Sequence, residues 1–138
     1  MAFVRPRRVR FSDCDPAGIV FFPQYLVMVN GQVEDWLHES LGYGFGGLLL
    51  TKRIGLPTVH LTVDFKGISH LDDELSLSLA AERLGRRSFT LRHRILGADG
   101  GLRAELQQVL VTTSMDTHQA IDLPEDLRAA VERTLENA

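Results

Sequence analysis

A second cysteine, long apolar runs and an excess of basic charge are all missing from this chain of 138 residues. The single cysteine, Cys14, has no partner for an internal disulfide, which is typical of a protein from a reducing compartment. No apolar stretch approaches the roughly 20 residues that a membrane-spanning helix needs, and the basic residues 1–8 lack the apolar segment of a signal peptide. The formal net charge of −3 does not indicate a nucleic-acid partner. We therefore expect a cytoplasmic protein whose partners include neither a membrane nor a nucleic acid.

Motifs for metal binding and for several common catalytic mechanisms are also missing. The five histidines never fall at the spacing of metal ligands, and His38 lacks the second histidine of a zinc-protease helix. Residues 13–18 imitate the start of a calcium-binding loop, but Gln24 stands where such a loop needs its closing glutamate. There is no Gly-x-Ser-x-Gly nucleophile motif and no phosphate-binding P-loop. The sequence thus predicts no metal site and no cofactor.

Apolar residues that recur every three or four positions predict one long helix and one short C-terminal helix. The long helix opens at Pro23 and runs for about five turns, until Gly42 supplies a stop signal. The short helix opens at residues 123–126, which place a proline and two acids in its first turn. Residues 45–54 form either a short helix or an irregular turn. The apolar stripes consist of Leu26, Val29, Val33, Trp36, Leu37 and Leu41 in the long helix and of Leu127, Ala130, Val131 and Leu135 in the short one.

Elsewhere the apolar period changes to two, which is typical of strands with one buried face. Residues 98–101 (Ala-Asp-Gly-Gly) are a strong hairpin signal, and 70–73 and 85–87 are turn-like. One strand, a long helix and four strands that mostly connect as hairpins indicate an α+β fold in a single domain, residues 1–138. We expect an antiparallel sheet of about five strands whose apolar face is covered by the long helix. The expected strands span residues 4–11, 59–66, 75–82, 89–95 and 102–115.

The segment from Asp13 to Tyr25 carries the most chemistry. An aspartate before a proline, as Asp15 is, often acts only as a turn former, because its side chain bonds the following backbone. Here four consecutive apolar residues, Ile19 to Phe22, would place this acid beside desolvated surface, where a carboxylate becomes more basic. The first turn of the helix that follows offers unpaired N–H groups at its positive end, a site for an oxyanion. An acid, an apolar shelter and a helix N-terminus together favour an enzyme that attacks a carbonyl group.

Two neighbours of Asp15 offer alternatives. Asp13 is either a turn residue or a group that tunes Asp15 by like-charge repulsion. Cys14 has no histidine near it in sequence, and the two flanking acids disfavour its thiolate. We expect neither of them to be the catalytic group.

Residues 13–25, which read Asp-Cys-Asp-Pro-Ala-Gly-Ile-Val-Phe-Phe-Pro-Gln-Tyr, closely resemble the signature of the 4-hydroxybenzoyl-CoA thioesterase family. The order of elements agrees from residue 4 to about residue 121, and residues 85–89 are similar to the family's basic turn-to-strand stretch. The resemblance implies a hotdog fold, in which a curved antiparallel sheet wraps a long central helix. It also implies a homo-oligomer: dimers that pair their sheets edge to edge, commonly joined as homotetramers, with the active site at the subunit interface.

The resemblance assigns roles to several residues. It implies that Asp15 is the catalytic carboxylate and that the backbone N–H of Phe22 polarises the thioester carbonyl. Whether Asp15 attacks the carbonyl or acts as a general base on water is left open by the sequence. Arg86 and Arg87 either form a solvated turn or grip the phosphates of coenzyme A by charge-assisted hydrogen bonds.

Two further residues complete the expected substrate site, and the reaction follows from the family. Ser88 would add a hydroxyl donor beside the coenzyme A phosphates, and Tyr25 either contacts the substrate or packs in the core. The resemblance implies hydrolysis of an aromatic acyl-CoA, of benzoyl or hydroxybenzoyl type, with coenzyme A as part of the substrate. The segment 43–58 departs from the family pattern, so a short aliphatic acyl group is the alternative. A non-catalytic acyl-CoA-binding domain and a hydratase on the same fold are further readings.

Overall fold

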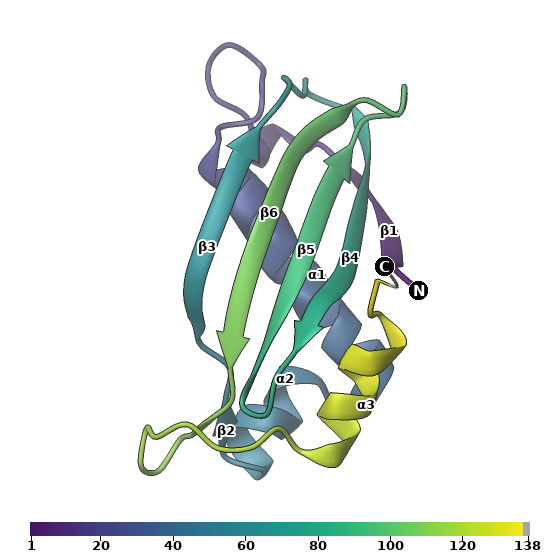
Figure 1. Ribbon diagram of the computed structural model, residues 1–138. Helices are drawn as coiled ribbons and strands as arrows, with labels where there is room; N and C mark the ends of the chain where they lie inside the picture. The colour runs from purple at the N-terminus through teal and green to yellow at the C-terminus, as the bar shows by residue number, and fades with distance from the viewer. Residues whose placement is uncertain (137–138) are drawn as a thin grey trace.

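A curved antiparallel sheet lies against one long helix in the computed structural model, which describes residues 1–136 (Figure 1). The α+β architecture predicted from the sequence is thereby confirmed. The five-stranded sheet and this helix, α1, are the main elements of the fold. The elements are β1 (Phe3–Arg8), η1 (Phe11–Asp13), α1 (Pro23–Leu41), α2 (Gly44–Gly46), η2 (Gly47–Thr51), β2 (Ile54–Gly55), β3 (Thr58–Phe65), β4 (Glu74–Leu84), β5 (Ser88–Leu96), β6 (Leu102–Val111), β7 (Thr113–Ser114) and α3 (Glu125–Arg133).

The main sheet has the strand order β1-β4-β5-β6-β3, and every neighbouring pair is antiparallel. The predicted hairpin turns 85–87 and 98–101 join β4 to β5 and β5 to β6, and Gly100 adopts φ +81° in the second of them. The turn-like residues 70–73 have a different role. They lead from β3 at one edge of the sheet to β4 near the other, so this connection is a crossover and not a hairpin (Figure 1).

Helix α1 begins and ends where the local signals predicted. Pro23 occupies its first turn, and Gly42 caps its end with φ +78°, a left-handed value that suits glycine. The predicted stripe is turned toward the sheet, where Trp36 and Leu37 are almost completely buried. Alternate residues of the strands complete this core, and Trp36 packs edge-on against Phe89 of β5 with ring centroids 6.1 Å apart. The helix covers the apolar face of the sheet, as expected.

Shorter elements refine three of the predicted segments. Residues 45–54 contain most of α2, the π-helical turn η2 and the first residue of β2. The long last strand is interrupted at Thr112, whose N–H donates to Arg87 O at 3.0 Å and whose hydroxyl donates to Ile121 O at 2.6 Å. The first strand ends at Arg8 instead of residue 11, so that Phe11 lies in η1 with 83% of its surface exposed.

The two outer strands of the sheet differ in their protection. Strand β1 carries Arg5, Pro6 and Arg7, and prolines and charges keep a sheet edge from pairing with other chains. Strand β3 has no proline, and its apolar side chains Val59 and Phe65 are 59% and 49% exposed. The β3 edge is therefore open to pairing, whereas the β1 edge is not.

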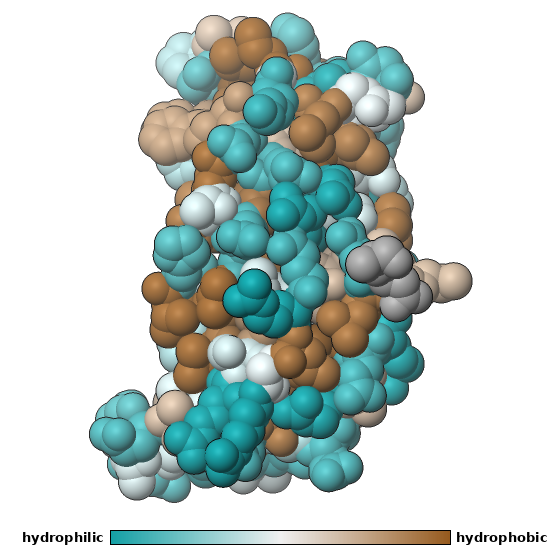
Figure 2. All heavy atoms as spheres, viewed as in Figure 1, coloured by the Kyte–Doolittle hydropathy of each residue, from teal (hydrophilic) through white to brown (hydrophobic). Residues whose placement is uncertain are grey.

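The outer face of the sheet is polar over its centre (Figure 2). Arg92 pairs there with Glu82 and Glu105, and Arg94 pairs with Glu105 and Glu136. These charges satisfy one another across neighbouring strands. Among the helices of residues 1–136, none combines the length and apolar character needed to cross a membrane.

Candidate active site

A tight loop between η1 and α1 carries Asp15 at the end of the sheet where β4 begins. The loop is closed by the pairing of Cys14 with Val20, and the Asp15 N–H donates to Ile19 O at 2.9 Å. Inside it, the Gly18 N–H donates to the Asp15 carbonyl at 2.9 Å. Gly18 has φ +77°, which a residue with a side chain would adopt only at a cost. The backbone therefore fixes Asp15 in place.

The loop is anchored on the crossover between β3 and β4. The Val20 N–H donates to Ser69 O at 2.9 Å, and the Leu71 N–H donates to Gly18 O at 3.0 Å. A further bridge pairs Ile19 with His70. The turn-like residues near position 70 thus hold the candidate catalytic loop instead of closing a hairpin.

The carboxylate of Asp15 is only lightly engaged. It is partly exposed, and its Oδ1 accepts one hydrogen bond, from the Ala17 N–H at 2.9 Å. Such a bond is typical of a turn-forming aspartate. Within residues 1–136 no basic side chain forms an ion pair with Asp15. Its second oxygen is therefore available to a ligand or a water molecule.

Asp13 is engaged on every side. Its side chain is almost completely buried, and Arg7 grips it with Nη1 at 2.9 Å from Oδ2 and Nη2 at 3.1 Å from Oδ1. The Arg10 N–H donates to Oδ2 at 2.8 Å. This geometry fits the role of a turn residue that ties η1 to β1.

Cys14 lies between these two acids. Partial burial raises the pKa of its thiol, and the charges of Asp13, Asp15 and Asp72 raise the pKa further. A thiol held in its protonated form is a poor nucleophile. The surroundings of Cys14 thus agree with the expectation that it is not the catalytic group.

The N-terminus of α1 lies next to this loop and presents a free donor. The Gln24 N–H donates to Phe21 O at 2.8 Å and the Tyr25 N–H to Phe22 O at 3.2 Å, while Pro23 has no N–H. For the Phe22 N–H, the described part of the chain offers no acceptor. A free N–H at the positive end of a helix can stabilise developing negative charge on a carbonyl oxygen.

The prediction that Ile19 to Phe22 form a desolvated surface beside Asp15 is wrong for the single chain. Of the four residues Ile19 to Phe22, only Val20 is buried, whereas Phe21 and Phe22 are 48% and 57% exposed. The stretch crosses the end of the sheet on its way to α1, so only one of its side chains reaches the core. An apolar run indicates that a segment tends to be shielded from water, but it does not show which part of the protein shields it.

The two exposed phenylalanines belong to an aromatic cluster that the sequence did not single out. Phe21 and Phe22 meet edge-on with ring centroids 5.4 Å apart, and Phe22 meets Phe65 of β3 in the same way at 5.8 Å. The only sequence signal for Phe65 was its place at the end of an alternating strand. The cluster borders the free Phe22 N–H and lies at the open edge of the sheet.

An apolar hollow of about 730 Å³ lies against the loop. Phe11 projects beside it, and Leu71, 40% exposed, forms part of its wall. Asp15 is its acidic member. The hollow is lined by Phe11, Ser12, Cys14, Asp15, Pro16, Gly18 and Leu71.

Arg86 and Arg87 lie at the opposite end of the sheet, in the turn between β4 and β5 (Figure 1). The Asp15 loop is bonded to the residues just before β4, and β4 itself contains 11 residues. At 3.3 Å per residue, the two ends are roughly 35 Å apart. The structure therefore does not bring the arginines and Asp15 together within one chain.

Ser88 and Tyr25, the other two predicted site residues, lie in different parts of the fold. Ser88 is partly buried in the first position of β5, and its carbonyl accepts from the Gly85 N–H at 2.8 Å. Tyr25 is buried, and its hydroxyl donates to Ser69 Oγ at 2.7 Å. This position is typical of a core residue that supports the loop, and substrate contact by Tyr25 stays a prediction.

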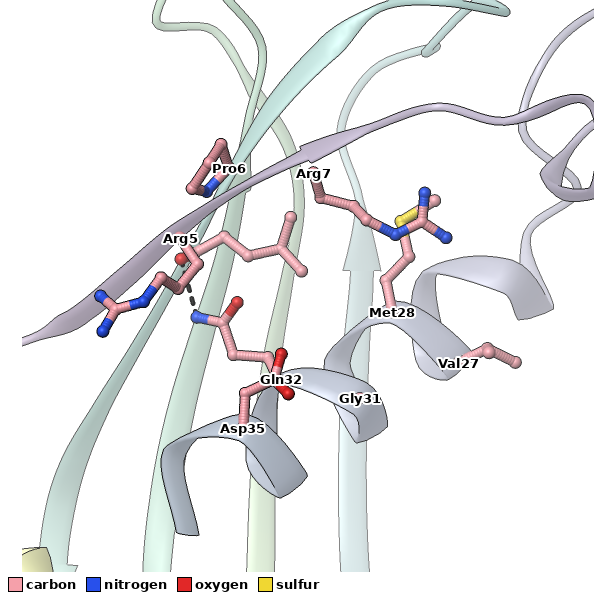
Figure 3. Close-up of a pocket in the computed structure, with 9 residues that line it drawn as sticks. Arg5, Pro6, Arg7, Val27, Met28, Gly31, Gln32 and Asp35 are labelled. Atoms are coloured by element: carbon pink, nitrogen blue, oxygen red, sulfur yellow. Dashed lines mark hydrogen bonds between the residues drawn. The ribbon is translucent and has the colours of Figure 1, made fainter. Parts of the chain in front are cut away.

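A second hollow, of about 210 Å³, separates β1 from α1 (Figure 3). Arg5 and Arg7 line it, but they are already paired with Glu39 and Asp13. Gln32 closes its floor by donating to Leu77 O at 2.7 Å. The polar groups of this hollow are already used in contacts between α1 and the strands. The Asp15 end of the molecule is therefore the better candidate site.

Comparisons with known proteins agree with this placement. The family model of the thioesterase-like superfamily matches residues 9–131. The 1,4-dihydroxy-2-naphthoyl-CoA hydrolase of Synechococcus sp. (strain WH7803) is 33% identical over 94% of this chain and 86% of its own length. The 4-hydroxybenzoyl-CoA thioesterase of Pseudomonas sp. (strain CBS-3) is 27% identical over 87% of this chain and 90% of its own.

A solved structure shares the fold as well. The gentisyl-coenzyme A thioesterase BH1999 superposes with a TM-score of 0.80 at 29% identity, covering 91% of this chain and 99% of the other. The predicted hotdog architecture and the predicted class of enzyme, a thioester hydrolase, are confirmed. This chain belongs to the thioesterase-like superfamily.

Proposed function

We propose that this protein hydrolyses the thioester of an aromatic acyl-CoA to the free acid and coenzyme A. The observation that carries the proposal is the presence of two free groups at one end of the sheet, the accessible Asp15 carboxylate and the unbonded Phe22 N–H. The aromatic preference is supported by the named relatives, which act on hydroxylated aromatic acyl-CoA esters. The exposed rings of Phe21, Phe22 and Phe65 supply the kind of surface on which an aromatic acyl group packs.

In the proposed reaction the Phe22 N–H donates to the thioester carbonyl oxygen as negative charge develops there. Asp15 acts by one of two routes. As a nucleophile, it bonds to the carbonyl carbon and the C–S bond breaks, so that coenzyme A leaves as a thiolate and water opens the mixed anhydride. As a general base, it takes a proton from the water that attacks the carbonyl carbon. Both routes use only the substrate and water, so we propose that no metal or separate cofactor takes part.

We further propose that the active unit contains a second copy of the chain. The open β3 edge, with Val59 and Phe65 exposed, suits antiparallel pairing with the same strand of another copy. Antiparallel pairing would bring the Asp15 end of one copy beside the Arg86–Arg87 end of the other. One acyl-CoA could then reach both, with its thioester at Asp15 and its phosphates at the arginines. A tetramer of two such dimers and a cytoplasmic location remain predictions.

The test is thiol release from benzoyl-, hydroxybenzoyl-, phenylacetyl- and short aliphatic acyl-CoA, with the wild type beside Asp15→Asn. We expect aromatic esters to turn over faster than aliphatic ones, and all turnover to depend on Asp15. Turnover of aliphatic esters alone would show that the proposed substrate is wrong and would leave the proposed mechanism intact. Binding without turnover of any ester would favour a non-catalytic acyl-CoA-binding domain.

A further inference from the structure

The turn that carries Arg86 and Arg87 is tied to a distant segment, residues 121–123. The Leu123 N–H donates to Arg86 O at 3.0 Å, and the Ile121 N–H donates to Thr112 O at 2.8 Å. The completely buried Thr112 in turn donates its N–H to Arg87 O at 3.0 Å. The residue between the two ends of this ladder, Asp122, is therefore held beside both arginines.

The carboxylate of Asp122 bridges the two guanidinium groups. Arg86 Nε lies 3.1 Å from its Oδ1 and 3.2 Å from its Oδ2, and Arg87 Nε lies 3.0 Å from Oδ1. All three side chains are more than half exposed. The hydrogen bonds from Arg87 and Arg86 lower the pKa of Asp122, so the carboxyl group is ionised at neutral pH.

This bridge leaves a specific part of each arginine unused. All three bonds engage Nε, and no acceptor in residues 1–136 lies against the terminal Nη nitrogens of Arg86 or Arg87. Two guanidinium groups so close together would repel each other without the anion between them. With it, the trio keeps a net charge of +1 and presents free donors to solvent, which suits a phosphate group.

We propose that Asp122 is a positioning residue that holds Arg86 and Arg87 as a preformed receptor for the phosphate groups of coenzyme A. The inference rests on the proposed function, because it assumes that these arginines bind the nucleotide end of the substrate. Asp122 does not touch the ligand. It fixes the spacing and orientation of two cations that would otherwise move apart and lose side-chain entropy on binding.

The test compares an aromatic acyl-CoA with the matching acyl-pantetheine, which lacks the nucleotide and its phosphates. For Asp122→Asn we expect KM for the CoA ester to rise about fivefold with kcat unchanged, and KM for the pantetheine ester to stay the same. Asp122→Glu, which keeps the charge, should restore most of the loss. The matched control is Asp99→Asn, which removes an exposed acid–arginine pair from the β5–β6 turn and should change neither KM. Binding of free coenzyme A, measured by calorimetry, should weaken by the same factor.

The double variant Arg86→Ala with Arg87→Ala separates phosphate binding by the arginines from the positioning role of Asp122. If it leaves KM for the CoA ester unchanged, the arginines do not bind phosphate, and both the receptor and that part of the proposed function are wrong. If it raises KM while Asp122→Asn does not, only the positioning role is wrong. A lower KM in Asp122→Asn would mean that Asp122 competes with phosphate for the arginines, which also overturns the proposal.

Discussion

Asp13 and Asp15 stand two residues apart, yet the protein treats them in opposite ways. Asp13 is 4% exposed and its two oxygens share three hydrogen bonds, two of them from Arg7. Asp15 is partly exposed and has one bond, from the backbone of its own turn. A carboxylate whose oxygens are all occupied holds the chain together, whereas one with a free oxygen can act on a substrate. The hydrogen-bond partners of each acid, and not its position in the motif, distinguish the structural carboxylate from the candidate catalytic one.

The strongest test of this comparison is Asp15→Asn. We expect kcat to fall about 100-fold or more, because the variant can neither attack the thioester nor take a proton. The free energy of unfolding should stay within about 0.5 kcal/mol of the wild type, since the asparagine oxygen can still accept from the Ala17 N–H. Thiol release and urea denaturation measure the two quantities. A wild-type kcat in this variant would show that Asp15 is not the catalytic carboxylate.

Asp13→Asn should show the reverse pattern. The asparagine has one acceptor oxygen, so Arg7 loses its two-pronged grip, and we expect the free energy of unfolding to fall by about 2 kcal/mol. Its kcat should fall much less than that of Asp15→Asn. Asp72→Asn is the control, because the exposed pair of Asp72 with Arg8 contributes less than about 1 kcal/mol. Loss of turnover with full stability in Asp13→Asn would reverse the two roles.

The smallest effect uses Cys14 as a reporter placed between the two acids. Both acids raise the pKa of its thiol, Asp13 more than Asp15, so removing either charge lowers this pKa and increases the thiolate fraction at pH 8. We expect alkylation by iodoacetamide to accelerate about twofold to fivefold in Asp13→Asn and less in Asp15→Asn. Asp72→Asn should give the smallest change. Equal rates in all four proteins would show that the acids do not control the thiol.

Features set by local signals were predictable from the sequence. Pro23 and Gly42 correctly predicted the two ends of α1, because a proline in the first turn and a left-handed glycine cap act on the residues next to them. The glycine-rich turn 98–101 marked the β5–β6 hairpin in the same way. The sequence motif also located the candidate loop, which is bonded to the residues just before α1 through the Phe21 N–H and Asp13 O.

Features set by long-range contacts were not predictable. Nothing local shows that β3 pairs with β6 at the far side of the sheet, or that 70–73 anchors the Asp15 loop. Asp122 lies 35 positions from Arg87, and its segment had no motif that related it to the arginines. The exposure of Phe21 and Phe22 follows from the path of residues 19–22 across the end of the sheet, which an apolar run does not show by itself.

The strand order also bears on how the chain folds in time. The hairpins β4–β5 and β5–β6 join neighbours in sequence, whereas Phe3 must find Leu79 and Phe65 must find Ala104. Closing such large loops costs entropy before any contact rewards it, which slows folding. We expect the β4–β5–β6 meander to gain amide protection first and both outer strands later in pulsed hydrogen exchange during refolding; simultaneous protection of all five strands would contradict this. Strand β3, through which we propose that two copies pair, would then join the sheet only after β4, β5 and β6 have formed, so the surface for pairing would not exist before the rest of the sheet supports it.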